Sequence, residues 1–77
     1  MDNLNLKLIG RDSWDRPVYQ DDSGKLWKDT DPLSWKEPNL CSSLANAFDG
    51  EPDVAMHDMS KYKGANIVFV PKRDVWR

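Results

Sequence analysis

Apolar and polar residues alternate at the start of the chain, where every second position is a leucine: Leu4, Leu6 and Leu8. Successive side chains of a strand point to opposite faces, so this pattern predicts a strand from about residue 4 to Ile9 with one dry face. The segment 10–15 is polar apart from Trp14, and its length is usual for a loop between neighbouring antiparallel strands.

The segment 16–29 predicts a hairpin that turns at Gly24. Glycine can adopt the left-handed backbone angles that close a three-residue loop, and this loop sets the register of the two strands. The predicted cross-strand pairs are Val18 with Lys28, Tyr19 with Trp27, and Gln20 with Leu26. Tyr19 and Trp27 therefore share one face of the hairpin, and the sequence leaves open whether that aromatic face is core or binding surface.

Prolines interrupt the pattern after the hairpin. Pro32 and Pro38 exclude a continuous strand or helix between them, so this segment predicts a loop that carries Trp35. Apolar residues then fall four positions apart, at Leu40, Leu44 and Phe48. With Gly50 placed to end a helix, this spacing predicts a helix over about 40–48.

The last third of the chain predicts a short helical element and a strand. The helical spacing is carried by Met56, Met59 and Tyr62. Gly64 would end that helix, and a single turn over 61–63 is the alternative. The run 65–70 is β-branched and aromatic on both faces, which is typical of an interior strand, and Pro71 ends its pairing.

These elements fit a single small α+β domain spanning residues 1–77. The predicted architecture is a small antiparallel sheet, a three-stranded meander plus the C-terminal strand, with the helix at about 40–48 packed on one face. Hydrophobic residues make up only 39% of the chain, so its eight aromatic residues, four of them tryptophan, must supply much of its apolar area.

The single cysteine, Cys41, excludes an internal disulfide. The first twenty residues contain no apolar run long enough for a signal peptide or a membrane helix. The sequence therefore predicts a cytoplasmic protein with no membrane partner.

Candidate catalytic chemistry is sparse. A nucleophile needs a base within hydrogen-bonding reach, and no spacing signature joins Cys41, the serines that follow it and His57. One histidine and one cysteine are too few for an ordinary zinc site, and the sequence has neither a calcium-loop pattern nor a glycine-rich phosphate loop. The chain is predicted not to be an enzyme and to bind no cofactor or metal; an enzyme using Cys41 or His57 is the weakest hypothesis.

Tryptophan is the residue type in excess, with four in 77 residues. So small a domain is not expected to bury every indole with its N–H satisfied, and exposed aromatic residues are enriched where proteins bind proteins. The predicted function is a non-enzymatic interaction module that presents loop aromatics to a protein partner. The candidate interaction residues are Trp14, Trp35, Tyr19, Trp27 and Trp76. For any single ring the alternative is a tryptophan folded over a thin core, and a homodimer through an exposed edge strand is a variant.

Charge is uneven along the chain, although the net charge is −2. Segment 32–59 carries five acids and one base, whereas segment 60–77 carries one acid and five bases: Lys61, Lys63, Lys72, Arg73 and Arg77. The alternative function is therefore a nucleic-acid accessory protein that binds phosphates through segment 61–77, with Tyr62 or Trp76 stacking on bases. The overall acidity counts against it, and a solvated surface is the simpler interpretation.

Two resemblances can be drawn. Tyr19 and Trp27 on a short hairpin, followed by Pro32, superficially resemble a WW domain, but Trp14 lies only five residues before Tyr19 and no histidine follows on the second strand. No ligand-binding role is transferred from that family.

The second resemblance covers most of the chain. Four segments carry it: IGRDSWDRPVY at 9–19, GKLWKD at 24–29, FDGEPD at 48–53 and VPK at 70–72. As a set they resemble small uncharacterised bacterial proteins, a domain of unknown function, some of them encoded near phage or plasmid genes. The resemblance implies a bacterial cytoplasm and no mechanism.

Overall fold

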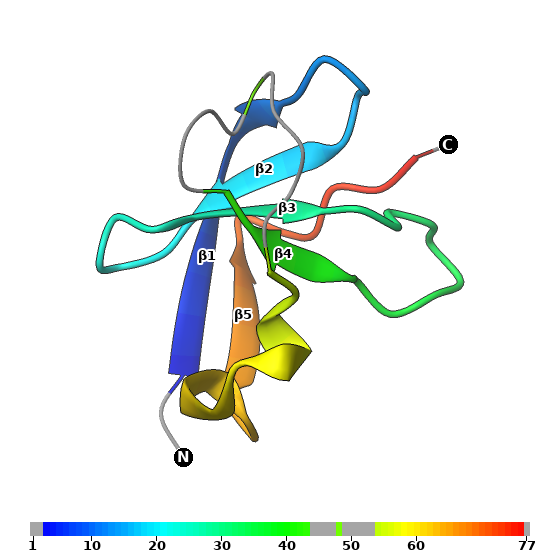
Figure 1. The fold of residues 1–77 in the computed structure, drawn as a ribbon. Coiled ribbons are helices and arrows are strands. Elements are labelled where there is room, and N and C mark those ends of the chain that lie inside the picture. The colour runs from blue at the N-terminus through cyan, green and yellow to red at the C-terminus, as the bar shows by residue number, and fades with distance from the viewer. Residues whose placement is uncertain (1–2, 44–47, 49–53, 77) are drawn as a thin grey trace.

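A computed structural model describes residues 3–43, 48 and 54–76. Its main feature is a five-stranded sheet in the order β4-β3-β2-β1-β5 (Figure 1). The strands are β1 (Asn3–Arg11), β2 (Pro17–Gln20), β3 (Leu26–Asp29), β4 (Leu40–Ser42) and β5 (Asn66–Val70). Strands β1 to β4 form an antiparallel meander, and β5 returns to pair with β1 in parallel.

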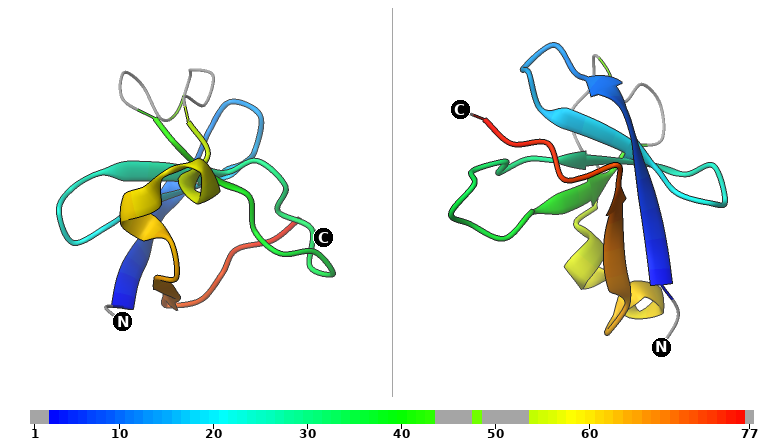
Figure 2. Two further views of the ribbon diagram at one scale, coloured as in Figure 1. Left: turned by 60° about the horizontal axis from the view of Figure 1, so that its bottom comes forward. Right: turned by 180° about the vertical axis from the view of Figure 1, so that it is seen from behind.

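The sheet curls into a half-barrel, with β4 and β5 at its two edges (Figure 2). Two short 3₁₀ turns, η1 (Met56–Asp58) and η2 (Ser60–Tyr62), connect β4 to β5 and lie between these edges. A register shift in β1 between Leu8 and Gly10 marks a bulge, which increases local twist and bends the strand. No helix within the described ranges is long and apolar enough to cross a bilayer.

The predicted α+β architecture with a packed helix is wrong. Residues 40–42 of the predicted helix form strand β4, which pairs with β3 so that Leu40 lies opposite Asp29. The backbone N–H of Asn39 donates to the Asp29 carboxylate at 3.0 Å, and the N–H of Thr30 donates to the Asn39 carbonyl at 3.0 Å. These bonds hold the chain extended as it enters β4, and long-range pairing overrides the local helical spacing.

The rest of the predicted helix is only partly described. Residues 44–47 lie outside the described residues, and Phe48 is in a turn. The Phe48 ring packs against Gly10, where an added Cβ would approach a ring carbon to 3.0 Å. A side chain at Gly10 would therefore displace the Phe48 ring.

The predicted hairpin register is confirmed, since Val18 pairs with Lys28, Tyr19 with Trp27 and Gln20 with Leu26. Gly24 has a φ of 90°, the left-handed geometry that the loop requires. The turn is stabilised by Asp21, whose Oδ1 accepts bonds from the backbone N–H groups of Ser23 and Lys25 at 2.9 and 3.0 Å.

The aromatic face of the hairpin forms the core. The buried cluster consists of Leu6, Tyr19, Trp27, Leu40 and Met56. The Tyr19 ring lies 5.0 Å from that of Phe69, and the Trp27 ring lies edge-on to Tyr62, also at 5.0 Å. Such aromatic pairs add stability beyond their area burial, which suits a small domain with few aliphatic residues.

Candidate interaction surface

Trp14 and Trp35 are the two most exposed large hydrophobic residues of the described chain, at 69% and 75% exposure. Trp14 lies in the loop between β1 and β2, and Trp35 lies in the loop between β3 and β4. In Figure 1 and in the right view of Figure 2 the C-terminal segment runs between these two loops. Three segments that are distant in sequence therefore meet at one end of the sheet.

Asp12 shapes the loop that carries Trp14. Its Oδ1 accepts bonds from the backbone N–H groups of Trp14 at 2.9 Å and Arg16 at 2.7 Å. Asp15 completes the turn with a φ of 63°, a left-handed conformation that aspartate tolerates better than most residues. The Trp14 indole is thus exposed on a turn that these hydrogen bonds hold in place.

The other carboxylate oxygen of Asp12 binds two cations. Asp12 Oδ2 lies 3.0 Å from Lys28 Nζ and 2.7 Å from Arg16 Nε, and the side chains of Asp12 and Lys28 are almost completely buried. Burial by itself would raise the pKa of Asp12, but the backbone hydrogen bond from Arg16 and the contacts with both cations outweigh it, so this pKa is lowered. The carboxylate therefore stays ionised and holds the loop on the sheet.

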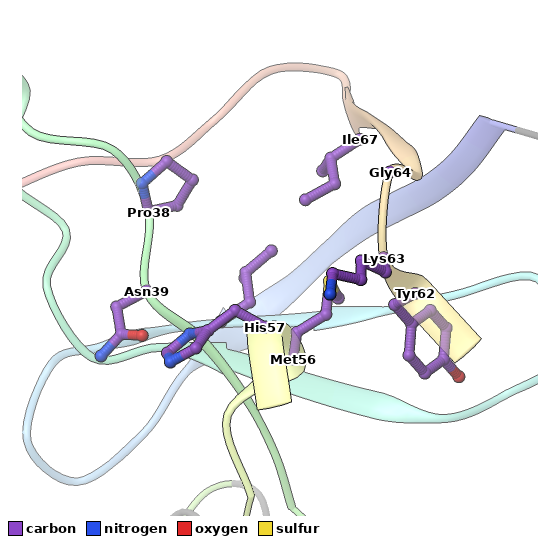
Figure 3. Close-up of a pocket in the computed structure, with 9 residues that line it drawn as sticks. Pro38, Asn39, Met56, His57, Tyr62, Lys63, Gly64 and Ile67 are labelled. Atoms are coloured by element: carbon purple, nitrogen blue, oxygen red, sulfur yellow. The ribbon is translucent and has the colours of Figure 1, made fainter. Parts of the chain in front are cut away.

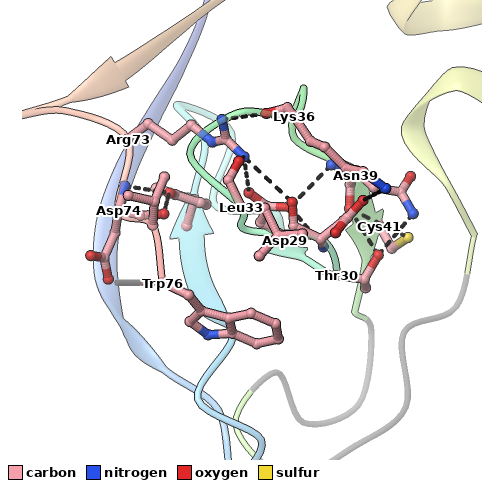
Figure 4. A network of polar contacts seen from close by, with 12 residues as sticks. Asp29, Thr30, Leu33, Lys36, Asn39, Cys41, Arg73, Asp74 and Trp76 are labelled. Atoms are coloured by element: carbon pink, nitrogen blue, oxygen red, sulfur yellow. Dashed lines mark hydrogen bonds and ion pairs between the residues drawn. The ribbon is translucent and has the colours of Figure 1, made fainter.

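Arg73 shapes the loop that carries Trp35 (Figure 4). Its guanidinium donates to the backbone carbonyls of Lys36 at 2.7 Å and Leu33 at 3.2 Å. It also forms an ion pair with the buried Asp29 carboxylate at 3.4 Å. One side chain of the C-terminal segment thus ties the loop to the sheet.

Trp76 connects the two loops. Its indole N–H donates to the Asp15 carbonyl at 2.7 Å, and its backbone N–H donates to the Pro32 carbonyl at 2.8 Å. Trp76 is itself 37% exposed. We call the surface formed by Trp14, Trp76 and Trp35 the tryptophan rim.

The C-terminal segment is fixed along its length. Arg11 binds the Asp74 carboxylate through Nε at 2.8 Å, and this hydrogen bond raises the pKa of Arg11 further above its usual range. The Tyr19 hydroxyl accepts a bond from the Asp74 backbone N–H at 3.0 Å. Trp76 is therefore folded back onto the domain.

A shallow cleft of about 400 Å³ lies beside Trp76, lined by Arg11, Asp15, Val75 and Trp76. Cations lie over the two exposed indoles, with the Arg16 guanidinium 5.6 Å from the Trp14 ring and Lys36 Nζ 5.0 Å from the Trp35 ring. These contacts orient the rings while leaving most of their surface open to solvent.

Tyr19 and Trp27, the other two candidate interaction residues, are fully buried. The Trp27 indole N–H donates to Asp21 Oδ2 at 3.0 Å, so its polar group is satisfied inside the protein. Burial raises the pKa of Tyr19, whose hydroxyl binds the C-terminal segment. Both residues are part of the core and offer no surface to a partner.

The basic segment divides between structural and exposed positions. Arg73 is engaged with Asp29, and Lys61 lies over the Tyr62 ring at 5.5 Å. Lys63 and Lys72 are exposed. Arg77 lies outside the described residues, and the nucleic-acid alternative stays a prediction.

The residues considered for catalysis lie apart from the rim. Cys41 is buried on β4, and the His57 side chain is exposed next to Asp58 at 3.5 Å. Among the described residues no group of three His, Cys, Asp or Glu side chains is placed to hold a metal ion.

A second hollow lies between the two edges of the sheet (Figure 3). It has a volume of about 320 Å³ and is lined from the β4 side by Pro38, Asn39 and Leu40, and from the other side by Ile67 of β5 and by the 3₁₀ turns. We call it the seam cavity.

Comparison with protein-family models, with curated proteins and with solved structures finds no match to this chain. The case for a function therefore depends on the geometry of these surfaces.

Proposed function

We propose that this chain is a non-enzymatic protein-interaction module whose contact surface is the tryptophan rim. The observation that carries the proposal is the exposure of Trp14 and Trp35 at 69% and 75%, in the two loops to which the partly exposed Trp76 bonds. Leaving such large apolar rings in water forgoes the free energy of their burial, about 1.5–3 kcal/mol for a large side chain. A partner that covers both rings would recover it.

The rim is prepared for contact because its loops are already ordered. Asp12 and Arg73 hold the two loops through several hydrogen bonds each, and Trp76 bonds to both loops. A surface that is ordered before binding loses little conformational entropy when a partner docks. Tryptophan is also among the residues that most often dominate binding energy at interfaces.

The charged groups of the rim are paired within the chain. Arg11 binds Asp15 and Asp74 at 2.8 Å, and Lys36 lies 3.7 Å from Asp31. A partner would therefore meet these five charges already paired with one another. The rim suits a folded protein whose contact surface is apolar at its centre.

The test is capture of partners from extracts of the source cells by the intact chain, followed by affinity measurement on the purified partner. The double substitution Trp14→Ala and Trp35→Ala should weaken the purified complex at least a hundredfold, since removing one dominant interface tryptophan typically costs about 2 kcal/mol or more. Val54→Ala, which truncates another exposed apolar residue, is the matched control and should leave the affinity unchanged.

Equal affinity of the double variant and the native chain for every captured partner would end the proposal. A steeply salt-dependent association with single- or double-stranded nucleic acid, unaffected by loss of the two rings, would instead favour the basic-segment alternative.

A further inference from the structure

The free edge of β5 is a second surface with unused binding capacity. β5 pairs with β1 on one side, and no strand within the described residues pairs with its other side. Backbone N–H and C=O groups on such an edge are a template for one more strand. The opposite edge of the sheet differs, because β4 is bridged there by the chain at Cys41 and Ala55.

The seam cavity lies along this free edge (Figure 3). Ile67 of β5 is part of its wall, and Leu40, Met56 and Tyr62 supply further apolar surface. A strand added to β5 would alternate its side chains between two faces, so every second side chain would point toward this hollow. The volume of about 320 Å³ is enough for one large apolar side chain.

The ionisable residues around this edge are mostly basic. His57 and Lys63 are the ionisable side chains among those described in the cavity lining besides Tyr62. Lys63 precedes β5 and Lys72 follows it, and both are exposed. An extended segment along β5 would therefore have a lysine near each of its ends.

The positions of Lys63 and Lys72 favour an acidic segment over a second copy of this chain as the strand that pairs with β5. In an antiparallel pairing of β5 with β5 of a second copy, Lys63 of each chain would come close to Lys72 of the other, and like charges at that position repel. A segment with acidic ends would meet the same two lysines favourably.

We propose that the free edge of β5 binds an extended acidic peptide segment of a partner protein by strand addition, with one apolar side chain seated in the seam cavity. Main-chain hydrogen bonds to β5 supply affinity, the cavity selects the apolar anchor, and Lys63 and Lys72 select acidic flanks. The site shares no residue with the tryptophan rim. This proposal is therefore independent of whether the rim binds a protein.

The experiment begins with the selection of short random peptides, displayed on phage, that bind the intact chain. The changes in backbone amide shifts of the chain on binding each enriched peptide are then recorded by NMR. Enriched sequences should alternate β-branched or large apolar residues with polar ones and carry Asp or Glu at their ends. The largest amide shifts should fall in 66–70 and in the two 3₁₀ turns.

Charge reversal then tests the selectivity. Lys63→Glu should weaken the enriched peptides about tenfold, since an exposed attraction is replaced by a repulsion. Lys36→Glu is the matched control: it makes the same change at another exposed lysine, in the loop between β3 and β4, and should have little effect. The Trp14→Ala and Trp35→Ala pair should also bind the peptides normally.

Three results would overturn the proposal: no enrichment over the background, affinity insensitive to Lys63→Glu, or shifts confined to the tryptophan rim. A dimer in sedimentation at raised protein concentration, with amide shifts at β5, would assign the edge to a second copy and would equally refute a peptide occupant.

Discussion

The Trp27 indole N–H and the Asp21 carboxylate form a buried hydrogen bond of 3.0 Å inside the β2–β3 hairpin. The same carboxylate accepts bonds from the backbone N–H groups of Ser23 and Lys25 in the turn. One aspartate thus joins the hairpin turn to the largest buried side chain of the core.

Asp21→Ala is therefore expected to destabilise the fold by about 3 kcal/mol, because it leaves several buried or half-buried donors without an acceptor. Urea unfolding followed by fluorescence measures the change. Asp22→Ala, at the exposed neighbouring position where the carboxylate accepts a bond from Asn5, should cost under about 1 kcal/mol. Equal losses in the two variants would contradict the role given to Asp21.

The stability of the domain should fall in acid. Burial would raise the pKa of Asp21, but hydrogen bonds from Ser23, Trp27 and Lys25 outweigh it and lower this pKa, as the Arg16 backbone N–H and the two cations do for Asp12. A carboxyl group with a lowered folded-state pKa stabilises the fold above its unfolded pKa of about 3.9, and this contribution is lost as the pH falls through the lower folded value.

Thermal unfolding temperatures should consequently be insensitive to these two groups from about pH 5 to pH 7 and decline below about pH 4. In Asp21→Asn the decline should be shallower, because that position no longer binds a proton. An identical acid profile in Asp21→Asn and the native chain would show that Asp21 does not contribute.

The elements that could be predicted from sequence are those fixed by local chemistry. Gly24 sets the hairpin register through its own backbone geometry, so the pairs Tyr19–Trp27 and Val18–Lys28 follow without knowledge of the rest. Strand β4 could not be predicted in this way, because the spacing of Leu40 and Phe48 suits a helix and the extended state depends on pairing with β3.

The tryptophan rim was predictable only in part. Their loop positions made Trp14 and Trp35 candidates for a binding surface but left open whether each ring would be core or surface; both are exposed. The bond from Trp76 to Asp15 joins residues 61 positions apart, and no local pattern reports such a contact. The burial of Lys28 could not be predicted from a local pattern either. Alternation places Lys28 on one face of the hairpin, but only the fold brings the Asp12 carboxylate within hydrogen-bonding distance of it.

Asp12→Asn should be among the most damaging single substitutions in the described chain. It keeps an oxygen for the loop N–H groups but leaves the buried Lys28 and Arg16 without their shared negative charge, a change that costs about 3–5 kcal/mol in buried ion pairs. Chemical unfolding measures the loss. Asp15→Asn, at an exposed carboxylate in the same loop, is the control, and a similar loss there would show that the buried charge is not the cause.

Iodide quenching of tryptophan fluorescence should separate the four indoles. Trp14 and Trp35 are open to solvent while Trp27 is fully buried, so replacing the two exposed rings by phenylalanine should remove most of the quenchable emission. Replacing Trp27 by phenylalanine should instead raise the fraction of the remaining tryptophan fluorescence that iodide quenches. Unchanged quenching in Trp14→Phe with Trp35→Phe would mean that these rings are covered, and the rim would lose its role.

Tyr19→Phe should loosen the C-terminal segment selectively. Its hydroxyl accepts the Asp74 backbone N–H at 3.0 Å, and deleting it should cost about 1 kcal/mol. Amide hydrogen exchange should accelerate at Asp74 and Trp76 more than at Leu6, which lies on β1 between β2 and β5. Tyr62→Phe, on η2 and away from this segment, is the matched control. Uniform acceleration at all three amides would show that the tyrosine hydroxyl supports the whole domain and not the rim in particular.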